Sequence, residues 1–126
     1  YAFMRNFAAN VQKIICEDHY LSAQAKAILD YINIHYSESI SLQETADYLG
    51  LSGTHISRIL KKETGETFTT YLNKIRIKES IKLLRSGQYK VYEVADRVGY
   101  SNYAYFYQIF KKNTGVSPKD YVWFMI

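Results

Sequence analysis

The residues of this chain that could bind a ligand through charge and hydrogen bonds fall in two segments that end alike. The first segment carries Arg58 and ends in Lys61 and Lys62, and the second ends in Lys111 and Lys112. A guanidinium group presents a planar fork of donors that matches guanine O6 and N7 or the oxygens of a phosphate. Ammonium groups neutralise phosphate charge. Two such segments predict contact with a polyanion whose features repeat.

The two segments belong to one longer duplicated pattern. Residues 41–65 read SLQETADYLGLSGTHISRILKKETG, and residues 90–115 read KVYEVADRVGYSNYAYFYQIFKKNTG. The first halves align at an offset of 49 and the basic ends at an offset of 50, so the second copy has one extra residue just after its turn. The grooves of duplex DNA recur with each helical turn, and this ligand therefore suits a protein that carries two copies of one pattern.

Each copy has the layout of a helix-turn-helix. A small alanine lets two helices cross closely, a glycine accepts positive φ in the turn, and a serine caps the next helix. These three residue types stand at corresponding positions of the two copies: Ala46, Gly50 and Ser52, then Ala95, Gly99 and Ser101. In this motif the second helix lies in the major groove of DNA. Short helix pairs are common, so two matches with the same Lys-Lys-x-Thr-Gly ending are stronger evidence than one.

The rest of the chain predicts an all-α fold. The whole chain has six glycines and one proline, and it has few runs typical of β-strands. The longest expected helix has a predicted buried face of Phe68, Tyr71, Leu72, Ile75, Ile81 and Leu84. Apolar spacing and capping residues predict helices and no strand, over 3–16, 23–36, 42–49, 53–64, 68–85, 90–98, 102–114 and a last one from Pro118.

Composition and charge agree with a small domain that binds a polyanion. The 126 residues are 48% hydrophobic, enough for a core, and the formal net charge is +4. Residues 1–40 hold three basic and four acidic side chains, whereas residues 41–126 hold thirteen and eight. The densest stretch, from Arg58 to Lys90, has nine basic residues against three acidic ones. Such clustering favours a polyanionic partner.

Neither catalysis nor a metal or other cofactor is expected. Cys16 is the single cysteine, so no intramolecular disulfide forms and a reducing cytoplasm is the expected compartment. Cys16 and His19 are too few ligands for a tetrahedral metal site, and His35 and His55 have no ligand spacing to them. The sequence shows no nucleophile with a base, no paired carboxylates and no glycine-rich phosphate loop. No run is long enough for a membrane span, so no membrane partner is expected.

With these residues the chain resembles the DNA-binding region of the AraC family of transcription regulators. The resemblance covers about residues 25–122 and is carried by the two Ala-Asp-x-x-Gly turns, the endings KKETG and KKNTG, the helix IRIKESIKLLRSG and the closing TGVSPKDYV. It implies two helix-turn-helix subdomains, 22–74 and 75–126, which share a long helix at about 68–85. It also implies that 1–21 is a linker helix from an upstream sensory domain, most similar to the receiver domain of a response regulator.

The resemblance also assigns the residues that contact DNA. Arg58 is the strongest candidate for reading a base, because its guanidinium can hold guanine in a bidentate pair. Gln108 stands where arginine is frequent in the family, and it can hold adenine in the same manner. The implied base contacts are Thr54, His55, Ser57 and Arg58 in the first copy and Tyr103, Ala104, Tyr107 and Gln108 in the second. The implied phosphate contacts are Ser52, Lys61, Lys62, Ser101, Asn102, Lys111 and Lys112.

The implied function is sequence-specific binding of double-stranded DNA, which regulates transcription. RNA polymerase and a second copy of the chain are the further partners that the resemblance implies. A helical protein-interaction or dimerisation module is the alternative. It accounts for the helices and the aromatic residues, but not for the duplicated turns and Lys-Lys endings. RNA binding is a weaker alternative, since the sequence lacks the aromatic motif of an RNA-binding sheet.

Overall fold

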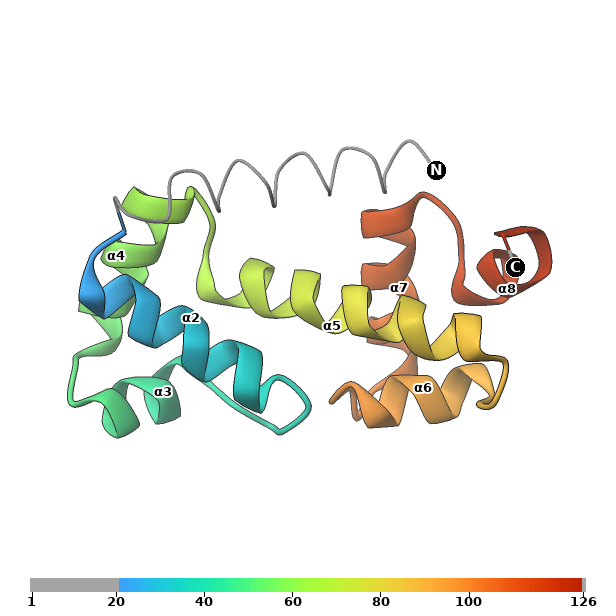
Figure 1. Cartoon of the computed structure of the whole chain (residues 1–126), viewed down its shortest axis with the longest axis horizontal. Helices are drawn as coiled ribbons and strands as arrows, with labels where there is room; N and C mark the ends of the chain where they lie inside the picture. Colours follow the sequence, from blue (N-terminus) through green and yellow to red (C-terminus); the bar gives the residue numbers. More distant parts are fainter. Residues whose placement is uncertain (1–20, 126) are drawn as a thin grey trace.

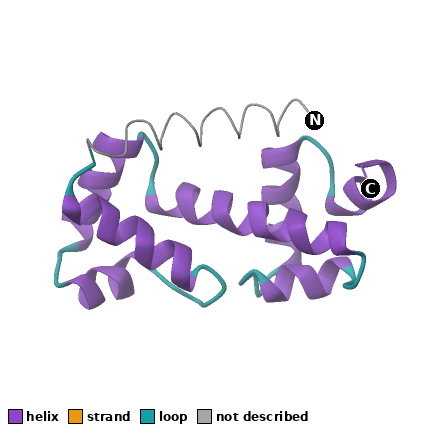
Figure 2. Ribbon diagram, viewed as in Figure 1, coloured by secondary structure: helices purple, strands orange, loops and turns teal. Residues whose placement is uncertain are grey.

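The protein is built from short helices arranged around one long helix, α5. The computed structural model describes residues 21–125, and within this range all regular structure is helical (Figure 1, Figure 2). The prediction of an all-α fold is therefore confirmed, while the predicted linker 1–21 lies outside the described residues apart from Leu21. The helices are α2 (Ala23–His35), α3 (Leu42–Leu49), α4 (Gly53–Thr64), α5 (Phe68–Ser86), α6 (Val91–Arg97), α7 (Tyr103–Thr114) and α8 (Pro118–Met125).

Capping side chains determine where most of these helices begin. The hydroxyl oxygens of Ser22, Ser41, Thr67 and Ser117 each accept a hydrogen bond from the backbone N–H three residues further on, at 3.0–3.1 Å. Such bonds satisfy N–H groups of the first turn that have no partner within the helix. Because these signals are local, the predicted starts from residue 23 onward agree with the observed starts to within one residue.

The first unit, α2–α4, packs around one hydrophobic cluster. Its apolar residues recur every three or four positions, so each helix turns a stripe toward the other two. The start of α5 completes the cluster with Phe68 and Leu72. The members from the first unit that are fully buried are Ala25, Ile28, Ile32, Ala46, Ile56 and Leu60.

The second unit, α5–α7, packs around a separate cluster, which α8 covers with Tyr121. Phe106 and Phe110 of α7 are fully buried, and the ring of Tyr121 meets Phe110 edge-on at 5.6 Å. The other buried members are Ile77, Ile81, Leu84, Val94, Ala95, Val98 and Tyr100. The two units therefore lie at opposite ends of α5, which contributes its first turns to one cluster and its later turns to the other (Figure 1).

The buried face of α5 differs in part from the prediction. Tyr71 and Ile75, expected in the core, are only half-buried. The helix contacts α4 at its start and then α6 and α7, so the face that must be covered changes along its length. A pattern of apolar residues alone also misses buried polar side chains. The residues buried without being predicted are Asn73, Arg76, Ile77 and Ser80.

Candidate nucleic-acid interface

Helix α4 presents three of the residues predicted to contact bases. The Ser52 hydroxyl oxygen accepts from the backbone N–H of His55 at 3.0 Å and starts the helix, as predicted. Ile56, Ile59 and Leu60 are buried and turn one face of α4 into the first cluster. The opposite face must then point to solvent, and it carries the exposed side chains Thr54, Ser57 and Arg58.

His55, the fourth predicted residue of α4, lies to the side of this face. It is half-buried, and its Nε2 donates a hydrogen bond to Gln24 Oε1 of α2 at 3.0 Å. The imidazole therefore ties α4 to the first helix of its own unit. This contact orients the helix that carries Thr54 and Arg58.

Helix α7 repeats the arrangement in the second unit. Phe106 and Phe110 are fully buried and pack with ring centroids 5.7 Å apart. Ala104, Tyr107 and Gln108 are exposed on the other face of the helix. Tyr103 is also exposed, although its ring lies 6.2 Å from that of Phe106 and burial of the phenol raises its pKa.

The start of α7 corrects one prediction. Asn102, not Ser101, caps the helix, because its Oδ1 accepts from the backbone N–H of Tyr105 at 3.1 Å. The physical reason is the extra residue of the second copy, which moves the start of the helix one position along the chain. Asn102 therefore corresponds to Ser52 at the offset of 50, and Ser101 lies outside the helix.

Alanine substitution of Asn102 and of Ser101, one at a time, tests which residue caps α7. Asn102→Ala should lower the free energy of unfolding by about 1 kcal/mol, because it removes an N-cap acceptor. Ser101→Ala is the matched control and should change that free energy by less than about 0.5 kcal/mol. Thermal or urea denaturation followed by circular dichroism measures both. If Ser101→Ala lowered the free energy of unfolding more than Asn102→Ala did, Ser101 and not Asn102 would be the cap of α7.

The structure adds Tyr105, which the sequence analysis missed. Its ring is exposed, and its hydroxyl oxygen accepts a hydrogen bond from Asn73 Nδ2 of α5 at 3.0 Å. Tyr105 is the counterpart of His55 at the offset of 50, so strict use of that offset identifies it. The two units thus share one contact. The third residue of α4, His55, is bonded to the amide of Gln24 on α2, and the third residue of α7, Tyr105, is bonded to the amide of Asn73 on α5.

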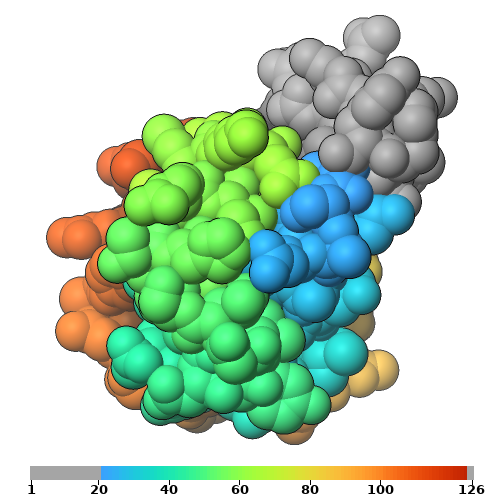
Figure 3. Space-filling view, turned by 90° about the vertical axis from the view of Figure 1, so that its left-hand side faces the viewer, coloured from blue at the N-terminus to red at the C-terminus, as the bar shows by residue number. Residues whose placement is uncertain are grey.

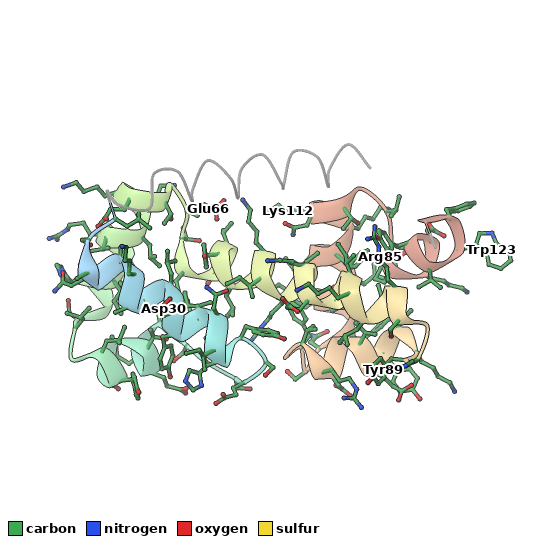
Figure 4. All side chains as sticks on the ribbon, viewed as in Figure 1. Asp30, Glu66, Arg85, Tyr89, Lys112 and Trp123 are labelled. Carbon is green, nitrogen blue, oxygen red and sulfur yellow. The ribbon has the colours of Figure 1, made fainter. Side chains whose placement is uncertain are left out.

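Positive charge is available at the far ends of both helices. Lys62, Lys111 and Lys112 are exposed, and no carboxylate within residues 21–125 lies within ion-pair distance of them. Figure 4 shows Lys112 at the upper end of α7. Lys61 is exposed and donates to the carbonyl of Gly65 at 3.3 Å. Exposed cations without an acidic partner keep their charge available to phosphates.

The two exposed helices lie toward the same side of the molecule. In the view along the long axis, α4 (green) and atoms of the second unit (orange) reach the surface on one side, and α2 (blue) lies on the other (Figure 3). Atoms of both units therefore lie on one side of the molecule (Figure 3).

Residues 21–125 contain no group of three or more His, Cys, Asp and Glu side chains that could hold a metal ion. None of the helices in this range is long and apolar enough to cross a membrane.

Known proteins share this sequence pattern. A family model described as a helix-turn-helix domain matches residues 45–122. The transcriptional regulatory protein HptR of Staphylococcus aureus (strain NCTC 8325 / PS 47) is 35% identical over 109 residues, which are 86% of this chain and 41% of that protein. An uncharacterized response regulatory protein of Staphylococcus epidermidis is 36% identical over the same shares. The chain thus spans about two fifths of the length of the curated relatives it matches.

Solved structures share the fold. The C-terminal domain of AraT, a response regulator from Geobacillus stearothermophilus, has a TM-score of 0.78 and 38% identity, with 81% of this chain and 85% of that chain covered. The C-terminal domain of the two-component response regulator yesN from Fusobacterium nucleatum has a TM-score of 0.75 and 31% identity, with 80% and 99% covered.

Proposed function

This chain belongs to the AraC-type family of helix-turn-helix DNA-binding domains of transcription regulators, and from that premise we propose that α4 and α7 are its recognition helices. Each enters the major groove of duplex DNA, and the two occupy successive groove segments on one face. The proposed subdomains are 22–74 and 75–126, which share α5.

The observation that carries this proposal is the matched exposure of the two helices. Thr54 and Arg58 are exposed on α4, and so are their counterparts Ala104 and Gln108 on α7. Helix α5 has 19 residues and is roughly 28 Å long at 1.5 Å per residue. One turn of DNA is about 34 Å. The units that carry α4 and α7 lie toward opposite ends of α5 (Figure 1), and the proposal therefore places the two helices in neighbouring segments of the major groove.

The two helices offer different chemistry to the bases. Arg58 holds guanine O6 and N7 through its guanidinium, with Thr54 and Ser57 beside it. In the second helix Gln108 holds adenine N6 and N7, and Ala104 contacts a thymine methyl group. The site that the protein prefers is therefore asymmetric, and the first half-site depends more on charge-assisted hydrogen bonds.

Phosphate contacts surround both readers. The oxygens of Ser52 and Asn102 accept their capping bonds, so the Ser52 O–H and the Asn102 Nδ2–H remain to donate to a phosphate. Each also stands at a helix start, where backbone N–H groups and the helix dipole favour an anion. The proposed set, all exposed, is Ser52, Lys61, Lys62, Ser101, Asn102, Lys111 and Lys112.

The proposed partners beyond DNA are a receiver domain, RNA polymerase and a second copy of the chain. Because the chain matches response regulators over about two fifths of their length, an upstream receiver domain is proposed to control it. RNA polymerase and a second copy of the chain are proposed as partners at the promoter. The proposed compartment is the cytoplasm.

Selection of bound sequences from a random duplex library tests the proposal most directly. The expected product is an asymmetric site with two conserved blocks separated by roughly one helical turn. Fluorescence anisotropy on the selected duplex then gives the affinity as a function of salt. Failure to retain any duplex at low salt would contradict DNA binding.

The salt dependence also tests the lysines at the ends of the recognition helices. Lys62→Ala should reduce the slope of log affinity against log salt by about 0.9, because one fewer counterion is released. The variant should lower the affinity for the selected duplex and for random duplexes by similar factors, since a phosphate carries no sequence information. Lys82, which pairs with Glu79 on α5, supplies the control Lys82→Ala, whose slope should equal that of the wild type. If Lys62→Ala and Lys82→Ala both showed the wild-type slope, Lys62 would not contact a phosphate of the DNA.

A protein-interaction function has one observation in its favour. On α8, Trp123 is 80% and Phe124 72% exposed, with Val122 beside them, and Figure 4 shows Trp123 projecting from the end of the molecule. Exposed apolar side chains in a group are typical of interaction sites. Absence of duplex binding, together with self-association that Trp123→Ser abolishes, would favour this alternative.

A further inference from the structure

Helix α5, which lies between the two copies of the pattern, carries a buried charge that the DNA-reading function does not use. Arg76 is only 8% exposed. Its Nε donates to the carbonyl of Tyr36 at 2.7 Å and its Nη2 to the carbonyl of Glu38 at 2.8 Å. Its hydrogen-bond partners within residues 21–125 are backbone carbonyls, whereas a buried guanidinium is usually paired with a carboxylate.

The position of these carbonyls explains how the charge is compensated. Tyr36 caps the C-terminal end of α2, where carbonyl groups lack partners within the helix and the dipole is negative. Arg76 thus holds the end of the first unit's leading helix against α5. The planar fork of the guanidinium fixes the direction of both bonds.

The same guanidinium also contacts the turn of the second unit. It lies over the ring of Tyr100, with Cζ 5.1 Å from the ring centroid. A Cβ atom on Gly99 would lie 3.1 Å from the Arg76 guanidinium and 2.8 Å from the Tyr36 carbonyl oxygen. The turn before α7 therefore closes directly onto the contact between Arg76 and the end of α2.

Asn73, one turn earlier on α5, continues this network to the recognition helix. It is 7% exposed. Its Oδ1 accepts from the Tyr100 hydroxyl at 2.7 Å, and its Nδ2 donates to the Tyr105 hydroxyl oxygen at 3.0 Å. Both polar atoms of the amide are satisfied, and each bond reaches a different part of the second unit.

Burial sets the titration of the two central groups without changing their charge at neutral pH. Desolvation lowers the pKa of the Arg76 guanidinium and raises the pKa of the Tyr100 phenol. Arginine nevertheless stays protonated in proteins, and the phenol stays a neutral hydroxyl. The cation over the ring and the O–H donor to Asn73 are therefore both present when DNA is bound.

The hydrogen bonds from Arg76 to Tyr36 and Glu38 join the second unit to the first, and they differ in kind from the apolar packing within each unit. The two hydrophobic clusters share a single partly buried member, Tyr36. Apolar contact is not directional, whereas hydrogen bonds weaken steeply when their angle changes. The orientation of the first unit relative to α5 is thus specified mainly by the two bonds of Arg76, and the bonds of Asn73 to Tyr100 and Tyr105 fix α7 against the same helix.

We propose that Arg76 and Asn73 are positioning residues, which set the spacing between the two half-sites that the protein accepts. They contact no base themselves. Arg76 holds the first unit to α5 and to the turn before α7, and Asn73 holds α7, so the two recognition helices keep one angle and one separation. This inference rests on the proposed function, since it concerns how two DNA-reading helices act together.

Binding to duplexes with altered spacing tests the inference. The selected site is rebuilt with the distance between its half-sites changed by one and two base pairs in each direction. Each base pair rotates one half-site about the DNA axis by roughly 35°. The wild type should prefer one spacing sharply. Arg76→Met, with a similar volume and no hydrogen bonds, should reduce that preference by at least about fivefold.

Further measurements separate positioning from folding and from base reading. Arg76→Met should bind an isolated half-site as the wild type does, and a second library selection should return the same bases in each block. Arg85→Met removes an exposed arginine of the same helix and should keep the wild-type spacing profile. If Arg76→Met does not melt cooperatively, Tyr100→Phe decides, because it removes the bond to Asn73 and leaves the ring under the guanidinium.

The outcomes distinguish this inference from the proposed function. A wild type that binds no duplex contradicts DNA binding itself. If the wild type prefers one half-site spacing sharply and folded Arg76→Met or Tyr100→Phe keeps the same spacing profile, the positioning role is overturned. A uniform loss at every spacing, the isolated half-site included, overturns it as well, because it assigns Arg76 to general stability or charge.

Discussion

Replacement of Gly99 by alanine should lower the free energy of unfolding by about 3 to 5 kcal/mol. Gly99 has a φ of 105°, in the region that residues with a side chain rarely adopt. An added Cβ would also lie 2.8 Å from the Tyr36 carbonyl oxygen, which is backbone and cannot rotate away. The strain of the turn and the clash add up. Urea denaturation, followed by circular dichroism, measures the loss.

Gly50, the counterpart in the first copy, provides a matched control. Its φ is 69°, but an added Cβ would have no atom within 4 Å. Gly50→Ala should therefore lower the free energy of unfolding by only about 1 to 2 kcal/mol, because the new residue must adopt the left-handed conformation but meets no other atom. If Gly99→Ala and Gly50→Ala lowered the free energy of unfolding equally, the contact with Tyr36 and Arg76 would not be the reason why position 99 requires glycine.

Arg58→Ala should weaken binding to the selected duplex by about 1 to 3 kcal/mol, while the affinity for random duplex falls much less. Arg58 is exposed on α4, and no carboxylate within residues 21–125 pairs with it. Its guanidinium is thus free to hold a guanine. A second library selection on the variant should lose the guanine in the first block and keep the second block.

Two variants make the test of Arg58 specific. Gln108→Ala should relax an adenine in the second block and leave the first block unchanged, because the helices read separate half-sites. Arg58→Lys should recover the charge without the planar fork, so it should restore affinity for random duplex more than for the selected site. Equal losses on selected and random duplex for Arg58→Ala would assign the guanidinium to a phosphate.

The two copies of the pattern have thus diverged unevenly. Their scaffolds agree, since Ala46 and Ala95 are both buried at the helix crossing and Gly50 and Gly99 both adopt positive φ. The exposed faces differ, with Arg58 on one helix and Gln108 on the other. In the proposed function, this difference directs two similarly held helices to different bases.

Most of the fold could be predicted because the signals for its helices are local. Ser22, Ser41, Thr67 and Ser117 each accept a bond from an N–H three residues away, and apolar spacing marks the face of each helix that is buried. The cap of α7 was predicted one residue too early, because Ser101 and Asn102 are both good caps and the extra residue of the second copy moves the start of the helix one position along the chain.

The sequence by itself determined the helices, the duplication, the membership of a family and the side chains that face outward on α4 and α7. These properties depend on residues within a few positions of one another. Tertiary packing, in contrast, buries Arg76 and Asn73, places Arg76 against the end of α2, bonds Tyr105 to α5 and sets Gly99 against the end of α2. Those contacts join residues up to 63 positions apart (Tyr36 to Gly99), and polar side chains in a helix give no apolar pattern that would reveal a buried, directional junction.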